Sequence, residues 1–476
     1  MTRFFRPLRW LTFLVAALLT LAPLHPAFAM LEGITGGITI EKEKQIGEEF
    51  VLQLQQYVSL VEDPFLTSYI NRLGQRLVAQ LGPQPFKYRF FIIADPSINA
   101  FAVPGGYIFI HTGLIRLMDR EGELAGVLAH EISHIYARHM VKAMEKARIP
   151  NIASLMGAMA AIFLGGPIAP ALAAGSMAAG ASANLKYSRD FEQEADSLGF
   201  RWMSQAGYNP RDMMAIFKKM SRQRWFEGRE IPVYLSTHPD INSRQVEFAN
   251  LLAKNQDRLP SPRPDTQDFQ YFSIRMEAVA GNPNQLLKRM TQEASREPKN
   301  PVYCYGQALA LSRLERTDEA VAAFKQALNL APGNALIQRD LAICYFQRNR
   351  YQEALQLLNQ LSQRYPQDEV ILYYLGRIYQ ERKQTDQALA LFEKVYNLNP
   401  ALTEVYYNLG TLYGEKGKLG LAHYYLGIHS LRSRALPTAL FHFRKAMQNL
   451  PTTDLHYAEV KNQVARLEKM RVRVPN

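Results

Sequence analysis

The sequence is poor in cysteine, which occurs only as Cys304 and Cys344 among 476 residues. Two cysteines form one bridge at most, so the fold cannot depend on a disulfide framework. Both fall on predicted helices, at positions whose register favours the interior. We therefore expect two buried thiols, and an oxidised pair is the alternative for an exported chain.

Uninterrupted hydrophobic runs are also short. One run spans 10–22. A second apolar stretch, 150–187, has Lys186 as its only charge, and Gly165-Gly166-Pro167 and Pro170 divide it into pieces of about 13 residues. A membrane-spanning helix needs ~20 residues, so these pieces are too short to span alone. We expect two short helices that form a lid, a membrane-dipping hairpin that touches lipid, or both; the alternative is a buried helical pair.

The first 29 residues have the pattern of a secretory signal. Three arginines precede the run at 10–22, and the small residues at 27–29 suit cleavage before Met30. An uncleaved anchor is the alternative. The formal charge of +12 falls to +9 when the three arginines are removed. A basic balance favours acidic proteins or anionic lipid headgroups as partners, and no segment resembles a nucleic-acid-binding module.

The motif with the most chemical content is His130-Glu131-Ile132-Ser133-His134. Apolar residues at helical spacing and a candidate cap at Asp119 predict a helix here. Four residues advance a helix by about 400°, so the two histidines share a face and can bind one zinc ion. Glu131 lies beside them as candidate general base for an attacking water. His139 falls about 180° round the helix and should point away from the metal, at the surface or behind a ligand.

A third ligand is predicted in 188–196, a second helical stretch rich in carboxylates. Glu192 and Asp196 are four apart and share a face, whereas Glu194 lies about 200° from Glu192 and should face solvent or neighbouring protein. We therefore assign Glu192 to the metal with His130 and His134. Asp196 is placed to orient a ligand histidine through its other ring nitrogen.

These HExxH and ExxxD blocks resemble those of the peptidases related to the CAAX-prenyl protease Ste24 and the heat-shock protease HtpX. A third block agrees with that family: Ser236-Thr237-His238-Pro239, with Arg244 six residues after the histidine. The resemblance implies an α+β zincin fold of the gluzincin type, one Zn²⁺ per chain and endoproteolysis. It also implies that His238 and Arg244 stabilise the transition-state oxyanion, or that His238 binds zinc in a latent state. The alternative for His238 is a turn residue before Pro239.

The segment 99–110 precedes the zinc helix and has the pattern of strand, glycine turn and strand. An exposed edge of this sheet would bind an extended substrate by strand addition, which depends on backbone rather than side chains. The alternative is that Asn99, Phe101 and their neighbours form only core sheet.

A proline-rich linker at 259–267 separates a predicted protease domain, 30–258, from a periodic region, 268–476. Residues there recur every 34 positions: Pro298, Pro332, Pro366 and Pro400, and likewise Ala320, Ala354, Ala388 and Ala422. That period identifies tetratricopeptide repeats, an all-α solenoid, and the phase breaks after Ala422. Such repeats bind peptides or partner proteins on a concave surface; the alternative is that they only cover the protease.

The combination of export signal, zinc-protease blocks and repeats resembles exported members of this family that act on outer-membrane proteins. The resemblance implies a periplasmic protease that degrades misfolded or stalled outer-membrane β-barrel proteins, with repeats that dock it on the β-barrel assembly machinery. The rival interpretation is a repeat scaffold or chaperone for envelope assembly whose protease fold has lost turnover. The intact metal and catalytic residues argue against that rival.

Overall fold

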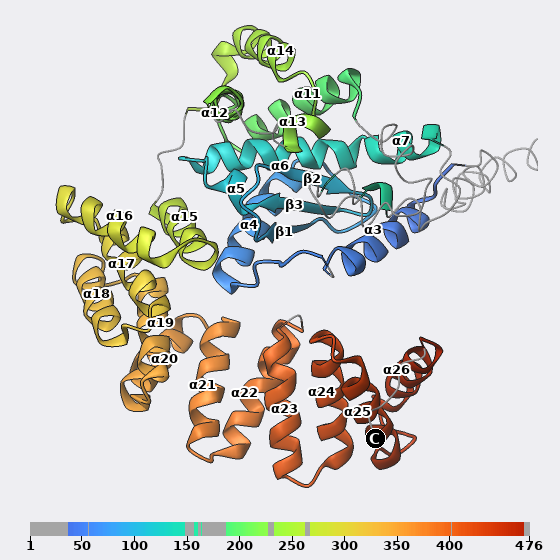
Figure 1. Cartoon of the computed structure of the whole chain (residues 1–476), viewed down its shortest axis with the longest axis vertical. Helices are drawn as coiled ribbons and strands as arrows, with labels where there is room; N and C mark the ends of the chain where they lie inside the picture. The colour runs from blue at the N-terminus through green and yellow to red at the C-terminus, as the bar shows by residue number, and fades with distance from the viewer. Residues whose placement is uncertain are drawn as a thin grey trace, which may run out of the picture. The chain divides into compact units, whose positions relative to one another are not determined.

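The computed structural model of the chain describes residues 37–55, 57–147, 157–159, 163, 187–226, 233–261, 267–400 and 402–470. The expected signal peptide and most of 150–187 lie outside the described residues. Internal contacts divide the chain into two compact units, Met1–Ala280 and Gly281–Asn476. Figure 1 shows a sheet covered by helices in the first unit and, among the described residues of the second, helices only.

The first unit contains a three-stranded sheet in the order β1-β3-β2. Its strands are β1 (Arg89–Ile93), β2 (Ala100–Val103) and β3 (Tyr107–His111). β3 runs parallel to β1 and antiparallel to β2. Gly105 and Gly106 have φ values of 84° and 95°, which favour glycine, and they make the tight turn that the sequence predicted between β2 and β3.

Side chains of α4 (Pro64–Val78) close the outer edge of β1. Asn71 donates to the Phe90 carbonyl at 3.0 Å and accepts the Phe90 amide at 3.3 Å. Gln75 donates to the Tyr88 carbonyl at 2.8 Å. The side-chain amides of Asn71 and Gln75 thus satisfy backbone groups of β1 at one edge of the sheet. β2 lies at the opposite edge.

The helix predicted around the two histidines is α6 (Glu121–Tyr136), in which residues 122–135 are all buried. It packs against the sheet and against α11 (Arg189–Gln205) and α12 (Arg211–Phe226), as Figure 1 shows. Because both sides of α6 are covered, its histidines face the protein interior.

The prediction that Asp119 caps this helix is wrong. The N-cap residue is Arg120, which makes no side-chain cap hydrogen bond. The Glu123 carboxylate instead reaches back and accepts the Asp119 amide at 2.8 Å. A carboxylate in the first turn satisfies an exposed amide as well as a capping side chain does, and it suits the positive end of the helix.

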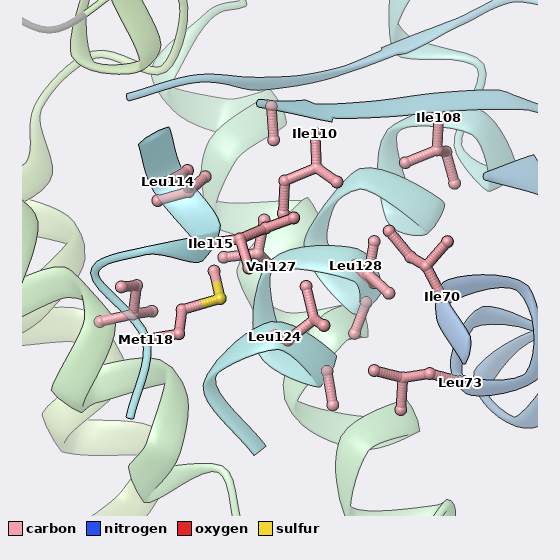
Figure 2. Packing of buried hydrophobic residues seen from close by; sticks show 14 of the residues in the cluster. Ile70, Leu73, Ile108, Ile110, Leu114, Ile115, Met118, Leu124, Val127 and Leu128 are labelled. Atoms are coloured by element: carbon pink, nitrogen blue, oxygen red, sulfur yellow. The ribbon is translucent and has the colours of Figure 1, made fainter. Parts of the chain in front are cut away.

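Apolar residues from α4, the sheet and α6 form the main core of this unit. Figure 2 shows how closely they pack; the residues labelled there are Ile70, Leu73, Ile108, Ile110, Leu114, Ile115, Met118, Leu124, Val127 and Leu128. The remaining elements are α3 (Ile40–Leu54), α5 (Thr112–Ile115), α7 (His139–Ala147), α13 (Val233–Thr237), α14 (Ile241–Lys254), the 3₁₀ turn η1 (Gln256–Arg258) and α15 (Gln267–Ala280).

The helix α15 belongs to the first unit by its contacts, although the sequence predicted that the repeat domain starts at 268. Phe272 stacks on Tyr69 with ring centroids 4.4 Å apart. Arg275 pairs with Asp63 at 2.8 Å. The spacing of aromatic residues in α15 resembles that of a repeat helix. Only these tertiary contacts show that α15 packs with the first unit.

The second unit consists of helices joined by short turns. They are α16 (Pro283–Arg296), α17 (Pro301–Arg313), α18 (Thr317–Leu330), α19 (Ala335–Gln347), α20 (Tyr351–Arg364), α21 (Glu369–Glu381), α22 (Thr385–Leu398), α23 (Thr403–Glu415), α24 (Leu419–Arg432), α25 (Leu436–Asn449) and α26 (Tyr457–Lys469). Successive helices pack side by side, and the predicted 34-residue period corresponds to one helix pair. The 34-residue period ends after Ala422, which lies in α24. The next helix, α25, packs on α24.

Small residues at the repeat positions allow the paired helices to approach closely. A Cβ atom added at Gly376 would lie 2.9 Å from the Phe392 ring. Cys304 and Cys344 are buried and unbridged, as predicted. Burial raises the pKa of Cys344 to about 11, which keeps it a thiol.

We expect Gly376→Val to destabilise the repeat unit by about 1–3 kcal/mol, because the new side chain overlaps Phe392 in a packed interface. The measurement is a urea titration followed by circular dichroism. Gly333→Val is the matched control, since a Cβ there meets nothing within 4 Å. Equal shifts for the two variants would contradict this account.

Candidate metal centre

Three predicted ligands come together on two helices. His130 and His134 project from α6 with their Nε2 atoms 3.0 Å apart. Glu192 projects from the first turn of α11, with Oε1 3.4 Å from His134 Nε2 and Oε2 3.5 Å from His130 Nε2. Ser188 caps α11 by accepting the Phe191 amide at 3.3 Å, which fixes where this first turn begins.

His238 joins the same cluster from the end of α13. Its Nδ1 atom lies 3.0 Å from Glu192 Oε1 and 3.3 Å from His130 Nε2. Its backbone amide bonds the Tyr234 carbonyl at 2.8 Å, so the last turn of α13 sets its position. The four side chains each offer a ligand atom within 4.8 Å of the others, and all four are buried.

This donor set fits zinc. With bonds of about 2.0–2.1 Å to nitrogen and oxygen, two ligand atoms of a tetrahedral zinc site lie about 3.4 Å apart. Five separations between donor atoms run from 3.0 to 3.5 Å, and all the ligand atoms lie within 4.8 Å of one another. Zinc binds imidazole nitrogen and carboxylate oxygen, so both the chemistry and the spacing agree.

Asp196 and Arg244 hold this cluster from behind. Asp196 Oδ1 lies 2.9 Å from His130 Nδ1, the ring nitrogen opposite the cluster, as the spacing predicted. Arg244, from α14, binds Asp196 through Nε at 2.8 Å and Nη2 at 2.7 Å, and its Nη1 lies 2.7 Å from Glu192 Oε2. The place at the oxyanion that the resemblance implied for Arg244 stays a prediction; in this structure its guanidinium contacts two carboxylates.

These contacts determine the charge of the carboxylates. Burial raises the pKa of Glu192 and of Asp196, but Arg244 and the neighbouring histidines together hold both values below their usual range. Burial in turn lowers the pKa of His134, which keeps this imidazole neutral and able to bind a metal. Glu192 and His134 are therefore in the protonation states that zinc requires. His130 differs: burial lowers its pKa, but hydrogen bonds to Asp196 and Glu192 raise it to about 9, so a metal that binds there displaces a proton.

Glu131 lies between the two ligand histidines in sequence, and its side chain is fully buried. Neither carboxyl oxygen has a hydrogen-bond partner within the described part of the chain. His238 Nε2 lies 3.6 Å from Glu131 Oε1. Burial raises the pKa of Glu131, so this carboxyl group is well placed to take up and release a proton.

The prediction that His139 continues the helix of His130 is wrong. The helix ends at Tyr136, and Arg138 has a φ of 54°, which turns the chain before α7 begins. His139 is buried behind a ligand, one of the two options left open, with its Nδ1 2.9 Å from His134 Nδ1. Glu194 lies 3.1 Å from the other ring nitrogen of His139.

Two tyrosines that sequence reasoning missed cover the histidines. Tyr187 stacks on His134 with ring centroids 3.8 Å apart, and Tyr234 stacks on His238 at 4.4 Å. Tyr187 precedes α11 and reaches His134 across the core, whereas Tyr234 lies four residues before His238 in the same helical turn.

The strip at 99–103 lies in the interior. All four residues of β2 are buried, and Phe101 stacks on Phe109 and on Phe163. Asn99 donates to the Phe163 carbonyl at 2.6 Å. The strip therefore contributes core residues.

Most of 150–187 lies outside the described residues, so its predicted lid or hairpin remains a prediction. Among the helices that the structure describes, none is long and apolar enough to cross a membrane.

Comparisons with known proteins agree with this geometry. Residues 64–250 match the model of peptidase family M48, and 311–378 and 371–401 match tetratricopeptide repeat models.

The chain is 33% identical to the beta-barrel assembly-enhancing protease of Escherichia coli strain K12 over 68% of each chain. It is 33% identical to the protein of that name from Yersinia pestis over 63% of each chain. The mitochondrial metalloendopeptidase OMA1 of Schizosaccharomyces pombe is 32% identical over 40% of this chain and 54% of its own. The matches thus span about two thirds of the first two relatives and about half of the third.

We expect Arg244→Leu to lower the free energy of unfolding of the first unit by about 3–5 kcal/mol, because two buried carboxylates lose their counter-charge. Urea denaturation in the presence of a chelator measures this without a contribution from metal. The control is Arg189→Leu, which breaks an ion pair whose arginine is 78% exposed and should change little. Similar losses in both variants would show that burial of the pair is not what matters.

Proposed function

The chain belongs to peptidase family M48, and from its site we propose that it is a zinc-dependent endopeptidase of the bacterial cell envelope. The observation that carries the proposal is the convergence of His130, His134 and Glu192 beside an unpartnered, buried Glu131. A scaffold has no need for a buried carboxylate without hydrogen bonds, since such a group costs stability. A hydrolase does need one.

The roles of the residues follow from their positions. His130, His134 and Glu192 bind zinc, which when bound supplies a Lewis acid that polarises the scissile carbonyl and lowers the pKa of a water molecule. Glu131 takes the proton of the attacking water at a carboxyl oxygen and passes it to the leaving amine. Asp196 keeps the His130 proton on Nδ1, so that Nε2 faces the metal.

The edge of β2 is the proposed place for the substrate backbone. The Asn99 carbonyl accepts the His111 amide at 2.9 Å, so in an antiparallel pair the residues that bond β3 are 99, 101 and 103. The amides and carbonyls of Ala100 and Ala102 then point away from β3. Tyr187, which stacks on His134, also lies with its hydroxyl 3.5 Å from the Ala102 carbonyl, and this brings the edge next to the zinc ligands. An extended peptide pairs there as an added strand.

Recognition by backbone suits unfolded substrates. The relatives named beta-barrel assembly-enhancing proteases support misfolded or stalled outer-membrane β-barrel proteins as the substrate class for this chain, with the periplasm as its location after signal cleavage. The repeats dock the enzyme on the β-barrel assembly machinery or deliver substrate to it. A non-proteolytic chaperone or scaffold is the second candidate, and the repeats alone favour it.

His238 regulates the site in this proposal. Its Nδ1 atom lies among the zinc ligands, and a fourth protein ligand occupies the position that a hydrolytic zinc site leaves open. The chain is then latent until the end of α13 moves. In the open form His238 is free to face the oxyanion, which reconciles the two roles that the resemblance implies.

We expect Glu131→Gln to lower kcat/KM for an unfolded outer-membrane β-barrel protein by about 10²–10⁴-fold, because glutamine cannot carry the proton. Zinc content and the urea midpoint should match wild type, since Glu131 makes no hydrogen bond within the described residues. Cleavage products resolved by gel and mass spectrometry measure the rate. If the double variant His238→Ala/Glu131→Gln cleaved as fast as His238→Ala, Glu131 would be removed from the mechanism.

We expect His238→Ala to cleave the same substrate faster than wild type, because the fourth ligand is lost. The assay compares the full mature chains at matched zinc loading, with the double variant His238→Ala/Glu131→Gln as the inactive control. A scaffold predicts no cleavage by any of them. Slower cleavage by His238→Ala would mean that this residue serves the oxyanion only.

A further inference from the structure

The ligand His134 has a partner that neither zinc binding nor proton transfer uses. His139 Nδ1 lies 2.9 Å from His134 Nδ1, and His139 Nε2 lies 3.1 Å from Glu194 Oε2. We propose that His139 and Glu194 are positioning residues that fix the tautomer and ring orientation of His134 through a two-bond chain. The inference rests on the zinc-binding role proposed above for His134.

The positions of the protons follow from the geometry. His134 turns Nε2 toward the other donors, 3.0 Å from His130 Nε2, so a metal takes the lone pair of Nε2 and the proton is on Nδ1. Two ring nitrogens 2.9 Å apart form a hydrogen bond only if one of them carries a proton. His139 Nδ1 is therefore the acceptor, and its own proton is on Nε2.

Glu194 completes the chain. An ionised carboxylate only accepts hydrogen bonds, so Glu194 suits the Nε2 proton of His139 and no other tautomer. One arrangement of protons satisfies both bonds. In it Glu194 selects the tautomer of His139, and His139 selects the tautomer of His134.

The surroundings hold His139 in this orientation. The left-handed residue Arg138 brings it out of the line of α6, and its ring stacks on Phe191 with centroids 4.3 Å apart at an interplanar angle of 11°. Phe191 and Glu194 both belong to α11, the helix that also supplies Glu192. The hydrogen bonds from His134 to His139 and from His139 to Glu194 thus link a ligand on α6 to α11, in addition to the contact between His130 and Asp196.

The two ligand histidines are supported in parallel ways. His130 donates directly to Asp196 at 2.9 Å, whereas His134 reaches a carboxylate through one intervening imidazole. Metal-binding histidines generally have such a partner on the far ring nitrogen, and its loss costs about 10–100-fold in metal affinity. A histidine buried only for packing would make no such difference.

The test uses zinc itself as the probe and does not require proteolysis. The zinc dissociation constant of the full mature chain is measured by chelator competition for wild type, His139→Leu, His139→Asn and His139→Gln. Asparagine places an oxygen where Nδ1 lies and can accept from His134, whereas glutamine reaches toward Glu194 but not His134. We expect about 10–100-fold weaker binding for His139→Leu and His139→Gln, and recovery of most of that loss for His139→Asn.

Glu194 provides a second variant that does not disturb the core, since its side chain is 50% exposed. Glu194→Ala should weaken zinc binding, and Glu194→Gln should restore it, because the amide oxygen still accepts the His139 proton. Glu247→Ala removes the same charge from a carboxylate that bonds Gln193 instead, and it is the control. The visible absorption of the Co²⁺-loaded chain should change in His139→Leu and return in His139→Asn.

Two results would overturn the proposal. Equal zinc affinity in all variants would mean that the hydrogen bonds of His139 and Glu194 have no influence on His134. Equal loss of zinc affinity in the leucine, glutamine and asparagine variants of His139 would mean that only packing matters. Neither result bears on whether the chain is a protease. Conversely, a wild-type chain that binds zinc in this pattern but cleaves nothing would leave the positioning roles intact and count against the proposed function.

Discussion

The site depends on one buried guanidinium. Arg244 joins α14 to α11 by binding both Asp196 and Glu192, and all three side chains are almost inaccessible to solvent. Two carboxylates buried without a counter-charge would take up protons or expel the helix that carries them. Because Arg244 keeps them ionised, one can bind a metal and the other can hold His130.

The helix α11 extends this arrangement over the whole centre. Glu192 faces the metal ligands, Asp196 supports His130, and Glu194 reaches His134 through His139. A single helix therefore supplies one donor and supports both ligand histidines. Glu131, by contrast, has no hydrogen-bond partner in the described residues and stays available to a proton.

Much of this could be predicted because it depends on helical periodicity. Four-residue spacing indicated that His130 and His134 share one helix face and that Glu192 and Asp196 share another. The 34-residue period indicated the repeats. Both patterns are local properties of the chain. Predictions failed where local structure ends. His139 was placed by extending α6 beyond Tyr136, but Arg138 turns the chain there. Asp119 was predicted as the cap from its residue type. In the structure the Glu123 carboxylate accepts the backbone amide of Asp119 instead. The boundary at 259–267 stays a prediction; the contacts of Phe272 and Arg275 in α15 with Tyr69 and Asp63 are ones that no local pattern indicates.

The sequence by itself determined which local patterns are present: two imidazoles four residues apart with a carboxylate beside the first, two further carboxylates four residues apart, and a 34-residue helical repeat. Within each helix, a fixed rise and rotation convert such spacing into direction. Only the tertiary structure decided which groups meet across helices. His238 among the ligands, Arg244 on two carboxylates and His139 between His134 and Glu194 all join segments separated along the chain. Such contacts depend on how helices pack, and packing is a property of the whole core rather than of any local pattern.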